Sequence, residues 1–192
     1  VSDENNLDIY PDSVDWTDMN TVNETGKHAG RYLYRTHEVR PVEGVPYSGG
    51  AVSVADLKTG EAEVLAQRAD WEALDGLVWT PWHTLLFAEE TITAQLPDPE
   101  VPNAQSGMLY ELKFVKNDPT TVKEIKVRPM LGSLSHEGIE IDDEGNVYVI
   151  DEDKKGAIYK FVPDTYGDLS SGQLHALRVK NGAKTGEAEW VA

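Results

Sequence analysis

Pairs of acidic residues close two alternating apolar runs of the chain. Glu89 and Glu90 end the run "TLLFAEE", and Asp151 and Glu152 end the run "NVYVIDE". Carboxylates about 4 Å apart repel each other by roughly 4 kcal/mol at an effective dielectric constant near 20, so several together need protons or cations among them. Oxygen ligands of this kind favour calcium, or magnesium and manganese, over zinc. The acids therefore predict a calcium-type site if the strand ends converge, and solvated strand ends if they do not.

Two histidine–glutamate pairs occupy related positions, His37 with Glu38 and His136 with Glu137. Adjacent residues of a strand point to opposite faces, so one pair cannot place both side chains on one metal without a bulge. We therefore assign the imidazoles a structural role and keep the glutamates as candidate ligands. Arg35 lies close to Glu38 in the sequence and could bind an anionic substrate through two parallel hydrogen bonds, or pair with a surface acid.

The elements that must position these residues are short strands. Eleven runs of alternating apolar residues, separated by glycine, proline, aspartate and asparagine, cover most of the chain after residue 29. A spacing of roughly 8 to 12 residues between strands is typical of an all-β sandwich, barrel or propeller. Helical signals are confined to a short turn or helix near residues 69–74.

An internal repeat decides among these architectures. Residues 75–91, "DGLVWTPWHTLLFAEET", align without a gap on residues 137–153, "EGIEIDDEGNVYVIDED", at an offset of 62. Each copy has an acid and a glycine, a strand, a turn, a second strand and an acidic ending, and Asp75 matches Glu137. A third strand then begins at Gly107 in one copy and at Gly156 in the other, an offset of 49. A weaker third copy places Glu38 at the acidic ending.

Such a unit, repeated every 50 to 60 or so residues, is typical of a β-propeller blade. The repeats near residues 30–66, 75–128 and 137–180 predict about three blades within residues 30–192, preceded by a lead-in segment at residues 1–29. Since propellers close with about four to eight blades, we expect a partial ring that another chain or a further segment completes. Equivalent ends of the inner strands converge on the channel, which places the candidate metal ligands at one mouth: Glu38, Glu89, Glu90, Glu137, Asp151 and Glu152.

The composition limits the partners. The chain has 34 acidic and 17 basic residues and a net charge of −17, which disfavours binding to nucleic acid or to an anionic membrane. No cysteine is present, so disulfides, zinc–thiolate sites and thiol nucleophiles are excluded. No apolar run approaches the roughly 20 residues of a membrane helix, and no signal peptide follows Val1.

Four segments carry a family resemblance: "GRYLYRTHE", "DGLVWTPWHTLLFAEE", "SHEGIEI" and "YVIDEDKKGAIYKFVPD". They resemble the His-Glu segments, the Thr-Pro-Trp-Gly-Thr segment with its Cys-Glu-Glu triplet, and the acidic motif before a Tyr-Lys/Arg-Phe-Val-Pro strand of bacterial PhoX-type alkaline phosphatases. The resemblance implies a β-propeller with a calcium- and iron-containing cluster at the mouth of its channel. It also implies hydrolysis of phosphate monoesters after export, and hence a periplasmic or secreted location.

Carried over by position, Glu89 and Glu90 match the acids of the triplet, and Glu137 matches the acid of a His-Glu segment. Asp151 and Glu152 match the later acidic motif. Ala88 stands where the family has the cysteine that ligates iron, which argues against a ferric cluster and leaves an all-oxygen calcium site intact.

We therefore expect a calcium-dependent phosphatase that acts on a small phosphate ester or another anionic substrate. The catalytic candidates are Glu89, Glu137 and Arg35, with the arginine holding the non-bridging oxygens while an activated water attacks phosphorus. Two alternatives stay open: a calcium-dependent lactonase of the gluconolactonase type, and a non-catalytic propeller module whose acids hold structural calcium.

Overall fold

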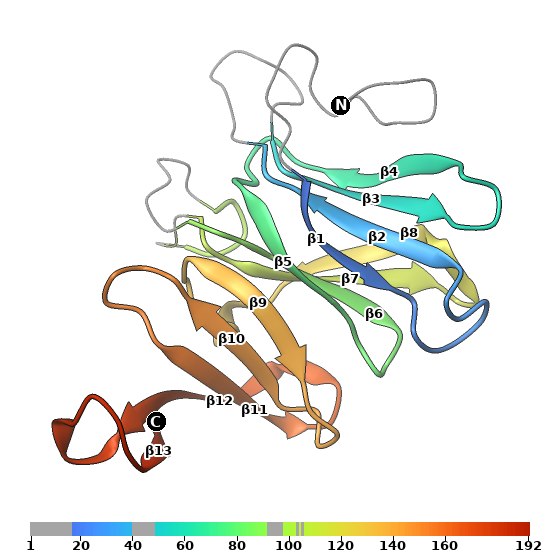
Figure 1. The fold of residues 1–192 in the computed structure, drawn as a ribbon. Coiled ribbons are helices and arrows are strands. Elements are labelled where there is room, and N and C mark those ends of the chain that lie inside the picture. Colours follow the sequence, from blue (N-terminus) through green and yellow to red (C-terminus); the bar gives the residue numbers. More distant parts are fainter. Residues whose placement is uncertain (1–16, 40–48, 92–97, 103, 105) are drawn as a thin grey trace.

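The computed structural model describes residues 17–39, 49–91, 98–102, 104 and 106–192 and contains three antiparallel sheets. Each sheet is built from consecutive strands, and the sheets follow one another across the molecule in chain order (Figure 1). The first sheet contains β1 (Thr17–Val22), β2 (Tyr32–His37), β3 (Ala51–Asp56) and β4 (Ala62–Gln67). The second contains β5 (Leu74–Trp79), β6 (Thr84–Glu89), β7 (Leu109–Val115) and β8 (Asp118–Val127). The third contains β9 (His136–Ile141), β10 (Val147–Asp151), β11 (Ile158–Thr165), β12 (Asp168–Val179) and β13 (Ala188–Val191).

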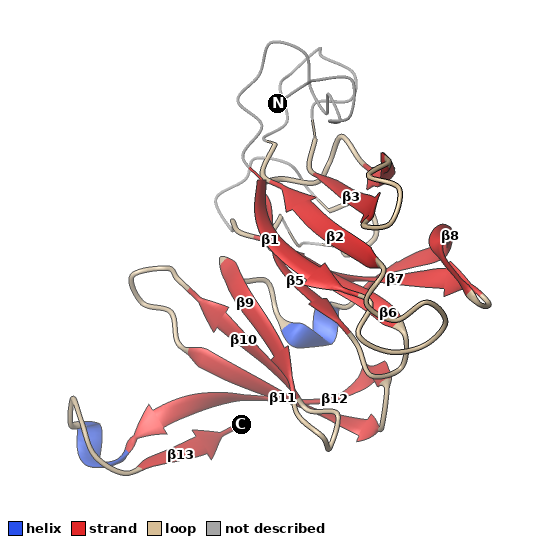
Figure 2. Ribbon diagram, turned by 45° about the vertical axis from the view of Figure 1, so that its right-hand side comes forward, coloured by secondary structure: helices blue, strands red, loops and turns tan. Residues whose placement is uncertain are grey.

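Helix is limited to two short 3-10 turns within the described residues, η1 (Pro129–Leu131) and η2 (Lys180–Gly182), which Figure 2 shows beside the strands. The predicted all-β class is therefore confirmed. The segment at residues 69–74 holds a turn and the start of β5. Within the part of the chain that is described, no helix is long and apolar enough to cross a membrane.

The eleven predicted strands are all present, and two further strands appear. β1 lies in the segment that the repeats assign to a lead-in, and β13 follows the last predicted strand. The sequence of β1, "TDMNTV", does not alternate between apolar and polar residues, and it carries no repeat signal. Its pairing with β2 instead defines it, since Asn20, Thr21 and Val22 lie opposite Arg35, Tyr34 and Leu33.

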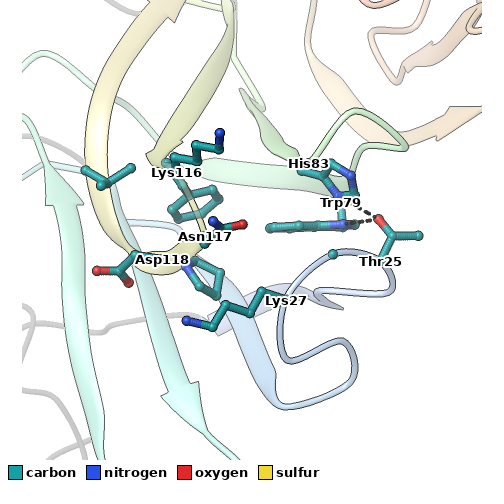
Figure 3. Close-up of a pocket in the computed structure, with 11 residues that line it drawn as sticks. Thr25, Lys27, Trp79, His83, Lys116, Asn117 and Asp118 are labelled. Atoms are coloured by element: carbon teal, nitrogen blue, oxygen red, sulfur yellow. Dashed lines mark hydrogen bonds between the residues drawn. The ribbon is translucent and has the colours of Figure 1, made fainter.

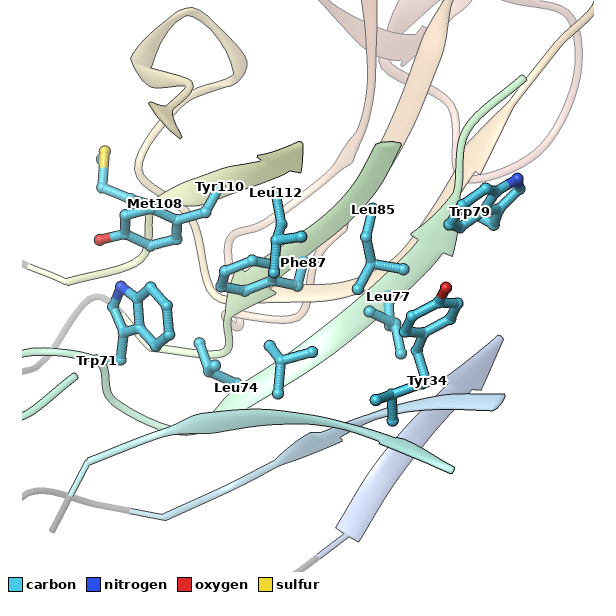
Figure 4. Close-up of a cluster of buried hydrophobic side chains, with 12 residues drawn as sticks. Tyr34, Trp71, Leu74, Leu77, Trp79, Leu85, Phe87, Met108, Tyr110 and Leu112 are labelled. Atoms are coloured by element: carbon cyan, nitrogen blue, oxygen red, sulfur yellow. The ribbon is translucent and has the colours of Figure 1, made fainter. Parts of the chain in front are cut away.

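The core consists of two apolar layers between neighbouring sheets. Figure 4 shows the layer between the first and second sheets, where Tyr34 stacks on Trp79 and Trp71 meets Phe87 edge-on. β6 is buried on both faces, which explains its uninterrupted apolar run. Its alternate residues Leu85 and Phe87 enter the first layer, and Leu86 and Ala88 enter the layer against the third sheet.

Candidate metal centre

Strand pairing brings the acidic ends of the sheets to one side of the molecule. Leu74 at the start of β5 lies opposite Glu89 at the end of β6, and His136 at the start of β9 lies opposite Asp151 at the end of β10. A single bridge from Glu90 to Ser135 joins the two sheets at this end. The acids of the second and third sheets therefore converge, as the repeat predicts.

Three carboxylates meet there and form what we call the acidic cluster: Asp75, Glu90 and Glu137. One carboxylate oxygen from each lies within 4.8 Å of the other two. Asp75 is only 1% exposed, and neither of its oxygens has a hydrogen-bond partner among the described residues. A buried carboxylate without donors is costly, whereas an oxygen-only group of this size suits a hard divalent cation. The residues therefore fit calcium or a similar ion.

The electrostatics of the cluster agree with this geometry. Burial raises the pKa of Asp75 to about 8, and the negative charges of Asp18, Glu137 and Glu38 add to the shift. Burial also raises the pKa of Glu90 above its usual range, with a further contribution from the negative charge of the neighbouring Glu152. The same two causes, burial and the charge of Glu152, raise the pKa of Glu137. The cluster holds its charge poorly without protons or a cation.

Three more acids, Asp18, Glu38 and Glu152, surround the acidic cluster. The positions of all six acids in their sheets follow one rule. Asp18, Asp75 and Glu137 are each the second residue of the first strand in their sheet. Glu38, Glu90 and Glu152 each follow the last residue of the second strand. All three sheets thus contribute one acid of each kind. The sequence prediction matched Asp75 to Glu137 in the repeat without listing it as a ligand, and it missed Asp18, which the rule would have identified once β1 was known.

Glu89 and Asp151, which the sequence predicts as metal ligands, accept hydrogen bonds from backbone amides. One oxygen of Glu89 accepts from the amide of Glu72 at 2.9 Å, and the other accepts from the amides of Gly107 and Met108 at 2.8 and 2.9 Å. Burial raises the pKa of this carboxyl to about 7, although the three amides oppose the shift. Asp151 accepts in the same way from two backbone amides. Both acids hold loops next to the acidic cluster.

The remaining candidates lie on the sheets. Nε of Arg35 donates to the side-chain oxygen of Asn20 at 2.8 Å on an exposed part of the first sheet. His37 is buried and its Nε2 forms a 2.7 Å hydrogen bond with the Ser53 hydroxyl. His136 is fully buried, and burial lowers its pKa to about 4. Burial and the hydrogen bond to Ser53 fit a structural role for His37, whereas neither ring nitrogen of the buried His136 has a hydrogen-bond partner among the described residues.

Two pockets of about 340 Å³ each border the sheets. One lies along the inner strands just beyond the acids and is lined by residues such as Thr21, Val78 and Glu140. The other lies at the opposite end of the sheets, where Trp79 donates to Thr25 at 3.0 Å and Lys27 and Lys116 also line the pocket (Figure 3). The first pocket therefore offers space for a small ligand next to the acidic cluster.

Comparison with known proteins identifies a similar solved structure and a matching family model. The solved structure of Pseudomonas fluorescens PhoX in complex with vanadate, a transition state analogue, superposes with a TM-score of 0.53 at 16% sequence identity. The superposition covers 91% of this chain and 48% of that one, so the chain spans about half the length of the solved protein. None of the curated proteins matches the chain.

The second match is to a family model. The model for the family described as alkaline phosphatase PhoX matches residues 79–192, which include Glu90 and Glu137 of the acidic cluster and the whole third sheet. This match covers more than half of the chain. The chain therefore belongs to the PhoX family.

Proposed function

We propose that the three sheets are consecutive blades of a β-propeller and that the acidic cluster is the metal centre of a phosphomonoesterase. One observation carries the proposal: Asp75 is buried within a group of three carboxylates, and neither of its oxygens is hydrogen-bonded to the described residues. Membership of the PhoX family supports phosphate chemistry. The complex of the solved PhoX with vanadate, a transition state analogue, adds to this support because vanadate resembles a phosphoryl group in transfer.

In this proposal Asp75, Glu90 and Glu137 hold a calcium ion through oxygen ligands. When bound, the ion would polarise the phosphoryl group and lower the pKa of a water molecule. Glu152 lies beside Glu90 and Glu137, and its negative charge contributes to the raised pKa of both. The burial of Asp75 excludes bulk water from this side of the cluster, which strengthens the electrostatic interactions within it.

The pocket along the inner strands would take the phosphate ester. Water adds to phosphorus and the ester oxygen leaves with a proton, so that the products are an alcohol and inorganic phosphate. Iron is disfavoured as a second metal, because Ala88 supplies no ligand and its methyl group is buried between the second and third sheets. By family membership we further propose a periplasmic or secreted location.

The test is a calcium titration of the purified chain followed by an assay with p-nitrophenyl phosphate. We expect calcium to raise the melting temperature of the chain and to be required for release of p-nitrophenol. Asp75→Asn should abolish both effects, whereas Asp143→Asn, at an exposed turn, should leave both unchanged. A chain that neither binds calcium nor hydrolyses the ester would contradict the proposal, and hydrolysis of a sugar lactone instead would favour the lactonase alternative.

A further inference from the structure

The pocket around Trp79, Lys27 and Lys116, which we call the basal pocket, lies at the end of the sheets opposite the acidic cluster. Its volume is about 340 Å³, and all its lining residues belong to the first two sheets and their turns. Trp79 and Phe114 contribute aromatic rings, with centroids 5.6 Å apart (Figure 3). A concave site with aromatic rings and a few polar groups is typical of small-molecule binding.

The basal pocket is basic although the chain is strongly acidic. The net charge of the chain is −17, but Lys27 and Lys116 both line this pocket, and neither forms an ion pair with a described residue. Asp118 also lines it, and its Oδ1 accepts from the amide and the hydroxyl of Thr120 at 3.1 and 2.9 Å. Two lysines and one aspartate leave one net positive charge, which suits a ligand with one negative charge.

A chain of hydrogen bonds selects the tautomer of His83, which lines the same pocket. Nε1 of Trp79 can only donate, and the Thr25 hydroxyl accepts from it at 3.0 Å. The proton of this hydroxyl is then free to be donated to Nδ1 of His83, 3.1 Å away. A neutral imidazole whose Nδ1 accepts carries its own proton on Nε2, which has no partner among the described residues. Nε2 is therefore a third donor available to an anion.

The turn that holds His83 does not itself require histidine. His83 matches Gly145 at the repeat offset of 62, and the two have positive φ values of 65° and 81°. Glycine adopts this left-handed conformation freely, whereas histidine does so at a cost. The facing loop leaves room for the imidazole, since a Cβ atom added to Gly26 would lie 3.0 Å from its Nδ1. A side chain kept in a costly conformation is a candidate for a functional role.

The corresponding place between the second and third sheets is used for packing instead. The β7–β8 and β11–β12 turns each hold two residues between paired strand ends, so Lys116 corresponds to Tyr166. The Tyr166 ring contacts that of Trp82 edge-on at 5.7 Å, and a Cβ atom added to Gly145 would lie 2.8 Å from it. At equivalent positions, one junction thus has a tyrosine against a glycine, and the other has a lysine and a histidine around a pocket.

We propose that the basal pocket binds a small aromatic carboxylate. The ring of the ligand would lie against Trp79 and Phe114, and its carboxylate would accept hydrogen bonds from the two lysines and from Nε2 of His83. The single net positive charge favours a monoanion over a doubly charged phosphate ester. This site is separate from the acidic cluster and independent of the proposed phosphatase activity.

The test is a titration of the full chain with benzoate, followed by proton–nitrogen NMR of the indole groups. The five tryptophans give five indole signals, and that of Trp79 is identified by its loss in Trp79→Phe. We expect benzoate to shift this signal with a dissociation constant on the order of 1 mM, as suits a ligand of about nine non-hydrogen atoms. Benzyl alcohol lacks the charge and acetate lacks the ring, so each should bind at least about tenfold more weakly.

Two variants and a matched control locate the site. Lys116→Ala and His83→Gly should each raise the dissociation constant of benzoate by about three- to tenfold, because each removes one donor to the carboxylate. Glycine at position 83 keeps the turn, as Gly145 does in the matching turn. Lys184→Ala removes the same charge at an exposed position before β13 and should leave the dissociation constant unchanged.

The remaining indole signals show whether each variant is folded, so loss of binding can be distinguished from loss of structure. An unshifted Trp79 signal at tens of millimolar benzoate would overturn the proposal. Equal binding of acetate and benzoate would do the same, since it would show an adventitious ion only. Equal effects of Lys116→Ala and Lys184→Ala would also overturn it, because binding would then follow the overall charge of the chain.

Discussion

Glu89 and Glu90 are adjacent in the chain, but their carboxylates lie in opposite environments. Glu89 accepts hydrogen bonds from three backbone amides, whereas Glu90 faces Asp75 and Glu137. The alternation of side chains at the end of β6 separates the two. Asp151 and Glu152 repeat the division at the end of β10. An acidic pair at a strand end can thus divide into one acid that holds loops and one that is available to a cation.

The most stringent test of this comparison is to replace Glu89, the acid that holds the loops. Glu89→Ala should lower the free energy of unfolding by about 3 to 5 kcal/mol, because it leaves three backbone amides without an acceptor in a buried place. Urea unfolding followed by circular dichroism would measure the change. Glu90→Ala serves as the control and should not destabilise the metal-free chain, since it removes a carboxylate that is repelled by its neighbours. Equal losses for the two variants would show that the comparison is wrong.

Stabilisation by calcium should depend on Glu90, whereas the stability of the metal-free chain should depend on Glu89. Calcium at about 100 times its dissociation constant should stabilise the parent chain by about 2.7 kcal/mol, and chelation should reverse the gain. Glu90→Gln should lose most of this gain and keep a normal metal-free stability, because the amide is a weaker ligand and carries no charge. Thermal unfolding with and without calcium would test this. A full calcium response in Glu90→Gln would place the ion elsewhere.

The third sheet offers a smaller version of the same test. Asp151→Ala should cost about 1 to 2 kcal/mol, because two backbone amides lose their acceptor at a partly exposed position. Glu152→Ala, in which an exposed side chain is removed, should change the metal-free stability by less than about 0.5 kcal/mol. Chemical unfolding of both variants would show whether the division of roles extends to this strand end. If Glu152→Ala proves the more damaging, it does not.

The smallest expected effect on stability concerns Asp142 in the turn after β9, whose carboxylate accepts several hydrogen bonds. Burial raises its pKa, but hydrogen bonds from Asn146, Tyr148 and the Glu144 amide outweigh this, and the pKa is held below its usual 3.8. Because the folded pKa lies below the unfolded one, the contribution of Asp142 is present above about pH 4 and is lost on further acidification. Asp142→Ala should therefore cost about 1 kcal/mol at neutral pH and progressively less below about pH 4. Asp143→Ala, at the exposed neighbouring position, should show no such dependence in acid unfolding curves.

Much of the fold could be predicted from the sequence, because strand alternation and an ungapped repeat are local signals. The repeat and the acidic endings predicted that Glu38, Glu90, Glu137 and Glu152 lie at one mouth, and the structure brings Glu90 and Glu137 together with Asp75. β1 could not be predicted, because its side chains do not alternate and its only definition is its pairing with β2. Asp18 was missed for the same reason.

The division between Glu89 and Glu90 could not be read from the sequence either. It depends on where the free amides of Gly107 and Met108 lie, and these follow a long connection whose path is not encoded by any local pattern. The same holds for Asp151, whose amide partners come from the segment before β9 and from its own turn. Local sequence identifies acids at strand ends, but only the packing of the loops decides which of them is satisfied.

At each junction between two sheets, a tryptophan ring contacts a tyrosine ring. Trp79 stacks on Tyr34 at 5.5 Å where the first and second sheets meet, and Trp82 contacts Tyr166 edge-on at 5.7 Å where the second meets the third. Fluorescence emission from variants that retain only one of these tryptophans would report the opening of one junction at a time. The order in which the sheets separate during unfolding could then be followed by intrinsic tryptophan fluorescence, without any added label.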